Sequence, residues 1–160
     1  MPRPETRGPV AAGTTGVPSW VPVASVLIAV AGLAVAAYLT IEHYTASTTL
    51  ACPETGVVNC QKVTTSAQSV VFGIPVALLG LVFFAAMLPL GLPVAWRAAH
   101  PLPRWGRAGF ALVGVGFVFY LVYTELFTLN AICLWCTAVH VLTLALFAVV
   151  AIGTAVSVPD

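Results

Sequence analysis

The chain has 160 residues, of which 60% are hydrophobic and only 7% are charged. Soluble domains carry about 25% charged residues, so this composition predicts a membrane protein and excludes an ordinary soluble domain. Six lysines and arginines stand against five acidic residues, and they form no basic patch of the kind that binds nucleic acid. The length suits a single domain.

Four long apolar runs follow one another along the chain, and each can cross about 30 Å of hydrocarbon as a helix. We therefore expect an all-α membrane protein, a bundle of four transmembrane helices with a cysteine loop between the first and the second. The expected helices cover residues 21–41, 70–95, 108–129 and 132–156. They form one membrane domain, residues 20–156, after a disordered cytoplasmic tail at residues 1–19 that is rich in Pro, Gly and Thr.

Local signals refine this expectation. The first apolar run is longer than the roughly 7–15 residues of a signal peptide, so we do not expect it to be removed. A lipoprotein site at Cys52 is disfavoured, because Thr49 stands where an aliphatic residue is expected. Asn130 is expected to cap the fourth helix. The third helix is expected to pack closely through Gly109, Gly114 and Gly116.

Positive charge predicts the orientation of the bundle. Five of the six lysines and arginines lie before the first apolar run or between the second and the third: Arg3, Arg7, Arg97, Arg104 and Arg107. Positive residues favour the cytoplasmic side, so both termini of this multi-pass cell-membrane protein are expected in the cytoplasm. The cysteines then face the extracytoplasmic side, where disulfides persist.

Two of the four cysteines lie in the polar loop 45–69. Pro53 and Gly56 allow the chain to turn back between Cys52 and Cys60, so a disulfide can form between them. In such a loop the pair can meet a soluble thiol protein.

The other two cysteines, Cys133 and Cys136, form a Cys-x-x-Cys pair at the start of the fourth helix. The helix dipole and free N–H groups lower the pKa of a thiol there, and the second thiol can resolve a mixed disulfide. Exchange between the two pairs would pass two electrons from a DsbA-like protein to a lipid-soluble acceptor, and a quinone is oxidising enough for that role. His140 shares their helix face and is a candidate to hydrogen-bond or protonate the quinone.

Other interpretations of the cysteines stay open. Both pairs also fit structural disulfides in a non-enzymatic tetraspan protein. Metal binding is disfavoured, since few histidines can add ligands and His100 is expected on the other side of the membrane; we expect no metal. Attachment of c-type haem needs a histidine directly after the second cysteine, and Thr137 stands there.

Several other side chains have two interpretations each. His140 fits a histidine satisfied by a neighbouring helix as well as a quinone contact. Trp135 fits an interfacial anchor as well as a substrate contact, and Phe72 fits lipid packing as well as a quinone pocket. Ser66 can position the loop backbone or bond a cysteine, and it also fits an ordinary solvated loop. Glu125 can support the site as a nearby carboxylate, but it is expected near the interface, where it can reach water.

The motifs also occur in a characteristic order. Seven residues separate Cys52 from Cys60, and Ser66 follows Cys60 by six. Phe72-Gly73-Ile74-Pro75 opens the second helix and Cys133-Leu134-Trp135-Cys136 opens the fourth. In this order, over residues 20–156, the chain resembles the vitamin K epoxide reductase family in its short bacterial form.

The resemblance implies a four-helix membrane bundle around a quinone, either menaquinone or ubiquinone. It implies that Cys133 and Cys136 are the active-site pair, with Cys136 nearest the quinone. It also implies that Cys52 and Cys60 relay electrons from a thioredoxin-fold partner. Ser66 matches a position that helps to orient the substrate ring.

His140 stands where the animal enzymes of this family have a tyrosine, which fits a quinone reductase better than an epoxide reductase. The chain ends at Asp160 without the fused thioredoxin-like domain of many bacterial relatives, so the partner is expected to be a separate protein. We take as candidate substrate contacts His140, Ser66, Phe72 and Trp135.

The sequence thus predicts a membrane thiol oxidoreductase that reoxidises a DsbA-like partner on the extracytoplasmic side, reduces a quinone and so supports disulfide bond formation. Within enzymes, the alternative is a vitamin K epoxide or quinone reductase driven by a reducing partner. It would use the same four cysteines.

Overall fold

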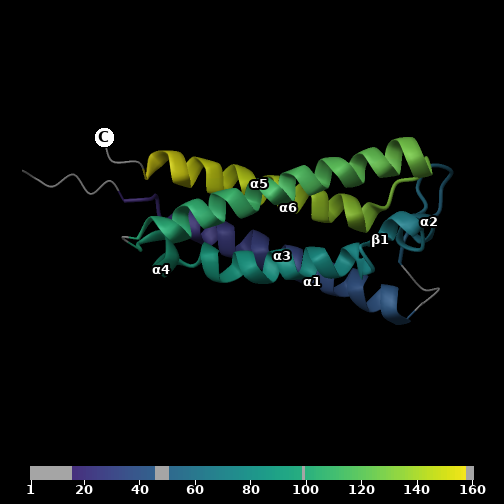
Figure 1. The fold of residues 1–160 in the computed structure, drawn as a ribbon, viewed down its shortest axis with the longest axis horizontal. Helices are drawn as coiled ribbons and strands as arrows, with labels where there is room; N and C mark the ends of the chain where they lie inside the picture. Colours follow the sequence, from purple (N-terminus) through teal and green to yellow (C-terminus); the bar gives the residue numbers. More distant parts are fainter. Residues whose placement is uncertain (1–15, 46–50, 99, 158–160) are drawn as a thin grey trace, which may run out of the picture.

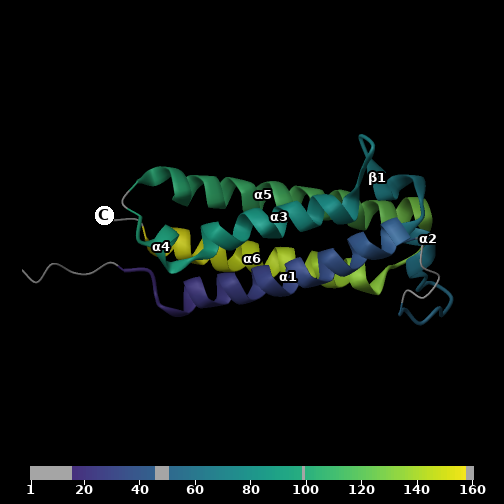
Figure 2. The same ribbon diagram turned by 90° about the horizontal axis from the view of Figure 1, so that it is seen from below.

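A computed structural model of the protein describes residues 16–45, 51–98 and 100–157. Within these residues, long helices lie side by side along one axis and form an elongated bundle (Figures 1 and 2). These helices are α1 (Trp20–Thr45), α3 (Val76–Gly91), α5 (Pro101–Tyr123) and α6 (Leu134–Val156). Residues 1–15, most of the predicted cytoplasmic tail, lie outside the described residues.

Short elements lie at the two ends of the bundle. The segment between α1 and α3 is at the same end as the start of α6 (Figure 2). It consists of α2 (Cys60–Thr64), a 3-10 turn η1 (Ala67–Ser69) and an antiparallel hairpin of β1 (Val70–Val71) and β2 (Ile74–Pro75). The short helix α4 (Pro93–Trp96) lies at the opposite end. The segment that carries Cys52 and Cys60 is therefore brought to the start of the helix that carries Cys136.

Three of the described helical segments are long and apolar enough to cross a membrane: Trp20–Thr45, Pro101–Leu129 and Leu134–Val156. They agree with three of the predicted spans. The remaining helix, α3, is apolar but has only 16 residues, about 24 Å at 1.5 Å per residue.

The predicted helix over residues 70–95 is too long at both ends. Phe72 and Gly73 have positive φ angles of 53° and 80°, and this pair turns the chain into a hairpin before the helix begins. At the other end Leu92 is extended, with φ −64° and ψ 149°, because the residue before Pro93 is held out of the helical region.

The bounds of the last two long helices also differ from the prediction. α5 begins at Pro101 and passes into a π-helical turn, η2 (Thr124–Leu129), while α6 begins only at Leu134. Asn130 is not the predicted N-cap of α6. It adopts a left-handed φ of 47° directly after η2, a conformation that asparagine tolerates better than most residues. The N-cap position of α6 belongs to Cys133.

The core lies where α1, α3 and α6 meet. Phe84 of α3 packs against Gly32 of α1, where a Cβ atom would overlap the phenyl ring. Further buried side chains surround this contact: Val21, Met87, Leu146 and Val150. The close approach of α1 and α3 therefore depends on a residue without a side chain.

Only one of the three glycines predicted to pack closely in the third helix does so. A Cβ on Gly114 would meet the Phe83 ring at 2.7 Å and Thr143 at 3.2 Å. Gly109 and Gly116 have no neighbour within 4 Å of that position.

Candidate redox site

The segment between α1 and α3 carries a disulfide between Cys52 and Cys60, whose Cα atoms are 6.1 Å apart. Gly56, with a φ of 52°, turns the chain between them. The two sulfurs differ in exposure, since Cys52 is half-buried whereas Cys60 is 0% exposed. A soluble partner can therefore reach the disulfide at Cys52 but not at Cys60.

Backbone hydrogen bonds tie this loop to the segment that leads into α6. The N–H of Asn59 donates to the carbonyl of Ile132 at 3.1 Å, and the N–H of Ile132 donates to the carbonyl of Val57 at 2.9 Å. Trp135 adds a third tie, because its indole N–H donates to the carbonyl of Ala51 at 2.9 Å. These bonds hold the loop pair of cysteines against the helix pair.

Cys133 and Cys136 are free thiols at the start of α6. Cys133 is the N-cap, and its Sγ accepts a hydrogen bond from the backbone N–H of Cys136 at 3.1 Å. A hydrogen bond from the Cys136 side chain lowers the pKa of Cys133, and this backbone N–H acts in the same direction, against the effect of burial. Cys133 is thus prepared to carry negative charge, as expected at a helix N-terminus.

The two cysteine pairs share one buried cluster. Its fully buried members are Cys60, Val63, Ala131 and Cys133. Cys52 and Cys136 pack against it as partly buried members. The inner sulfur of the loop pair and the N-cap sulfur of the helix pair are therefore enclosed together, out of contact with water.

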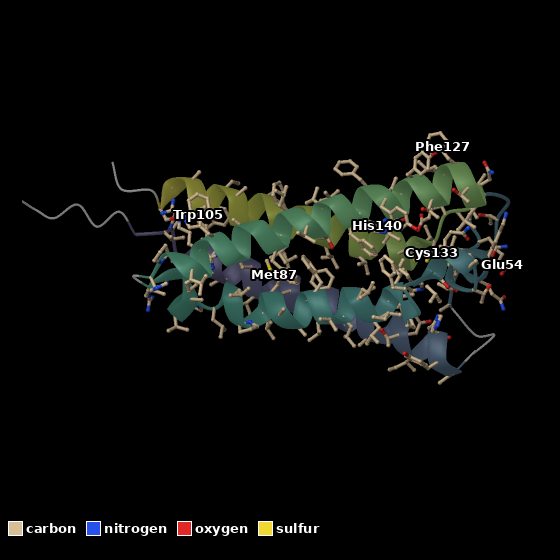
Figure 3. The ribbon with its side chains drawn as sticks, in the orientation of Figure 1. Glu54, Met87, Trp105, Phe127, Cys133 and His140 are labelled. Atoms are coloured by element: carbon tan, nitrogen blue, oxygen red, sulfur yellow. A yellow bond between two sulfur atoms is a disulfide. The ribbon has the colours of Figure 1, made fainter. Side chains whose placement is uncertain are left out.

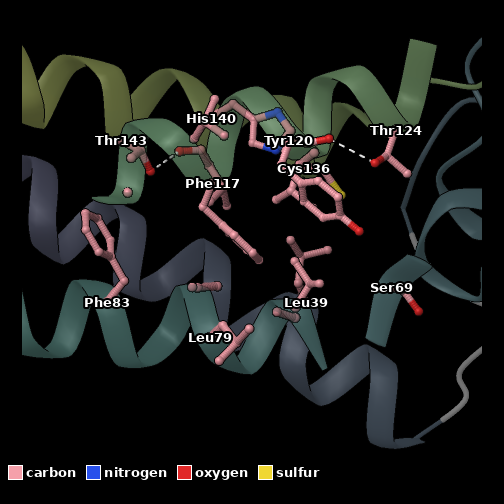
Figure 4. A pocket seen from close by; sticks show the side chains of 18 of the residues that line it. Leu39, Ser69, Leu79, Phe83, Phe117, Tyr120, Thr124, Cys136, His140 and Thr143 are labelled. Carbon is pink, nitrogen blue, oxygen red and sulfur yellow. Dashed lines mark hydrogen bonds between the residues drawn. The ribbon is translucent and has the colours of Figure 1, made fainter. Parts of the chain in front are cut away.

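A cavity of about 500 Å³ lies beside this cluster, between α1, α3, α5 and α6. Figure 4 shows Cys136, His140 and Tyr120 on its α5–α6 side, with Leu39, Leu79 and Phe83 among the apolar side chains. Cys136 lines the cavity, whereas Cys133 does not. A volume of this size with apolar walls and a few polar groups is typical of a small-molecule site.

The predicted substrate contacts fall into two groups. His140 is buried and lines the cavity. Ser66 lines it too, with its hydroxyl donating to the carbonyl of Val63 at 2.7 Å. Phe72 is 100% exposed at the tip of the hairpin, away from the cavity. Trp135 is not a lining residue either; it packs on Tyr38, with ring centroids 5.0 Å apart, and holds the loop.

Glu125 was expected to reach water, and this expectation is wrong. The side chain is only 6% exposed and lines the same cavity as Cys136 and His140. Glu125 lies in the π-helical turn η2, whose residues do not follow the spacing of the α-helix before it, and apolar periodicity does not reveal such a turn. A single carboxylate in an otherwise apolar run was the available signal for this residue.

The described residues contain no group of three or more His, Cys, Asp or Glu side chains placed to hold a metal ion. Fold and site together define a helical membrane protein with two cysteine pairs beside an apolar cavity. The family model of the vitamin K epoxide reductase family matches residues 23–151, and the chain belongs to this family. It is therefore a membrane oxidoreductase of the thiol and quinone type. No curated protein matches the chain.

Proposed function

We propose that the protein oxidises the dithiol of a DsbA-like, thioredoxin-fold partner and passes the electrons through its two cysteine pairs to a quinone. The observation that carries this proposal is the shared burial of Cys60 and Cys133, with Cys136 of the same cluster lining the apolar cavity. A path of sulfur atoms thus leads from the surface to a site for a lipid-soluble molecule. The net reaction converts partner dithiol and quinone into partner disulfide and quinol.

In this proposal residues 20–156 form a four-span domain of the cell membrane, with α3 as the second span. α3 is short, but the hairpin before it and α4 after it extend the apolar segment over residues 70–96. The segment with Arg97, Arg104 and Arg107 lies at the end away from the cysteines, as Trp105 and Cys133 show in Figure 3. Positive charge favours the cytoplasm, so the cysteine end is assigned to the extracytoplasmic side.

The first step takes place at the loop disulfide. A thiolate of the partner attacks the half-buried Cys52, which breaks the Cys52–Cys60 bond and leaves Cys60 as a thiolate. The second thiol of the partner then resolves the mixed disulfide, so the partner leaves oxidised and Cys52 is released as a thiolate. The difference in exposure between the two sulfurs supports this order of attack.

The second step passes the electrons inward. In the oxidised enzyme Cys133 and Cys136 form a disulfide, and the Cys60 thiolate attacks it at Cys133. Cys136 is released as a thiolate at the cavity wall. Cys52 then attacks Cys60, which restores the loop disulfide and frees Cys133. The helix pair now holds the two electrons that the partner gave up.

The cavity fits a quinone, which accepts two electrons and two protons when it binds there. Apolar side chains of α1, α3 and α5 can cover the ring and tail, while His140 is placed to donate a hydrogen bond to one of its oxygens. The Ser66 hydroxyl already donates to Val63, so its oxygen can accept a hydrogen bond from the quinol. His140 lies on the same helix as Cys136, so it would orient the ring toward that sulfur. His140 is also the group placed to move a proton as the ring is reduced.

The test is quinol formation by purified protein supplied with a reduced thioredoxin-fold substrate and menaquinone or ubiquinone. Cys136→Ser is expected to abolish multiple turnovers, because the sulfur at the cavity is lost. The matched control is Ala151→Ser, which puts the same hydroxyl on an exposed position of α6 and is expected to keep full activity.

Full turnover by Cys136→Ser would overturn the proposed electron path. Thiols that ignore both the partner and added quinone would instead identify two structural disulfides. Vitamin K epoxide in place of the quinone tests the alternative reductase within the same assay, since that reaction needs the same four cysteines.

A further inference from the structure

A second cavity, of about 260 Å³, lies at the end of the bundle away from the cysteines. It is enclosed by α4, the start of α5 and the end of α6, and its polar lining comes from Trp96, His100, Arg104, Arg107 and Ser157. Among the described residues no acidic side chain lines it. The cavity is therefore a concave site whose charged side chains are all of one sign.

Arg107 is the most unusual of these residues because it is only 1% exposed. Its guanidinium lies over the Trp96 ring, 3.3 Å from the centroid, and Nη1 donates to the carbonyl of Leu90 at 3.0 Å. Its buried Nε has no hydrogen-bond partner. A guanidinium carries five N–H donors, and burying such a charge is costly unless it is paired. The stacking on Trp96 and the single carbonyl acceptor leave other N–H donors of Arg107 without an acceptor.

Other donors converge on the same cavity. The Arg104 guanidinium is fixed by bonds to the carbonyls of Thr154 at 3.2 Å and Ser157 at 3.4 Å, yet its Nε is also without a partner. Nδ1 of His100 accepts the N–H of Leu102 at 3.1 Å, so Nε2 of the neutral ring carries the hydrogen. The N-terminus of the 23-residue helix α5 adds its positive end.

We propose that this cavity binds a phosphate-class anion, with Arg104 and Arg107 as its charged ligands. Arginine pairs with phosphate oxygens through two parallel N–H donors. The cavity opens where the apolar helices end, which is the depth at which basic pockets between helices hold phospholipid headgroups. The phosphate comes either from an anionic lipid or from solution. The site is independent of the cysteines and of the proposed electron path.

The experiment compares lipid adducts of the intact purified protein by native mass spectrometry, with phosphatidylglycerol and phosphatidylcholine as probes. We expect phosphatidylglycerol to be retained and phosphatidylcholine not. Arg104→Gln is expected to weaken retention about tenfold or more, the effect of losing a charge-assisted hydrogen bond. The control is Arg97→Gln, which removes an exposed charge from the same end without touching the cavity, and it should change retention less than about twofold.

Arg107→Lys tests the buried ligand, because lysine keeps the positive charge but lacks the planar, forked donors of the guanidinium. Weaker retention of phosphatidylglycerol by this variant supports the proposal. Competition by millimolar inorganic phosphate would assign the site to free phosphate, and its absence to the lipid headgroup. Equal retention of both lipids, or equal losses in Arg104→Gln and Arg97→Gln, would overturn the proposal. If phosphatidylglycerol bound to the Asp160→Asn variant but not to the unmodified protein, the carboxylate of Asp160 would be the occupant of the cavity. That result would also overturn the proposal.

Discussion

The two cysteine pairs are held in opposite ways. Cys52 and Cys60 belong to a loop that is closed by its own turn and tied to the bundle by backbone hydrogen bonds. Cys133 and Cys136 stand at the regular start of α6, where one caps the helix and the other faces a cavity. The loop pair meets water at one sulfur, and the helix pair meets an apolar space at one sulfur. What surrounds each sulfur decides which molecules it can react with.

The proposed electron path requires both pairs because its two substrates occupy different environments. A soluble protein cannot enter an apolar cavity between helices, and a quinone cannot leave the bilayer to meet an exposed loop. The enclosed sulfurs of Cys60 and Cys133 lie between these two environments. In the proposed electron path, thiol exchange there would connect the two environments without exposing the cavity to water.

The largest effect is expected when the two loop cysteines are replaced one at a time. Cys60→Ser should stop turnover, because the loop disulfide cannot form. Its free Cys52 should displace the leaving thiol of a single-cysteine partner that is activated as a mixed disulfide with thionitrobenzoate, which joins the partner to Cys52 by a disulfide. Cys52→Ser should stop turnover without such an adduct, since Cys60 is fully buried. Non-reducing gel electrophoresis after mixing with this activated partner measures both outcomes. An adduct on Cys60 in the Cys52→Ser variant would reverse the assigned order.

The next effect concerns the cavity end of the path. His140→Phe keeps an aromatic ring at the cavity but removes both ring nitrogens. We expect quinol formation to fall about tenfold to a hundredfold, the range for loss of a hydrogen bond or a proton donor. Partner oxidation in a single turnover without quinone serves as the internal control and should not change. An unchanged rate of quinol formation would remove His140 from the site.

The pKa of Cys133 provides a smaller and more direct test. It is lowered mainly by the hydrogen bond from the Cys136 side chain, so Cys133 forms its thiolate more readily than an ordinary cysteine does. Cys136→Ala removes that donor and should move formation of the Cys133 thiolate to higher pH. Thiolate absorbance in a variant without the loop cysteines measures the shift. A titration that moves to lower pH would contradict the assigned cause.

The smallest effect is expected for the indole that holds the loop. Trp135→Phe keeps the ring beside Tyr38 but loses the hydrogen bond to Ala51. The net worth of such a bond is about 0.5–1.5 kcal/mol, so transfer between the pairs should slow by about twofold to tenfold. Stopped-flow measurement of partner oxidation gives the rate. Trp20→Phe, at an exposed residue near the other end of α1, is the control and should behave like the unmodified protein.

Most of the fold could be predicted from the sequence, because apolar runs of spanning length have few alternatives in a membrane. The errors lie at helix ends, where single residues decide whether the helix continues. Phe72 and Gly73 turn into a hairpin where the apolar run alone predicts helix. Asn130 ends a π-helical turn instead of capping α6. Apolar periodicity carries no information about such local backbone choices.

The candidate site was only partly predictable for a related reason. Spacing places Cys136 and His140 on one helix face, and the structure has both at one cavity. Spacing does not report on side chains that come from other helices. Trp135 turned out to bind the loop backbone, and Glu125 turned out to be buried. The stacking of Arg107 on Trp96, which creates the basic cavity, also joins residues of two separate helices.

The sequence by itself determined the class of this protein, its apolar helices and its two cysteine pairs, because composition and spacing are local properties. Only the tertiary structure decided that Cys60 and Cys133 share one buried cluster and that Cys136 alone of the helix pair lines the cavity. The physical reason is that burial depends on which surfaces meet. The backbone bonds of Val57 and Asn59 to Ile132 bring together segments more than 70 residues apart in the chain, and no local pattern records that meeting.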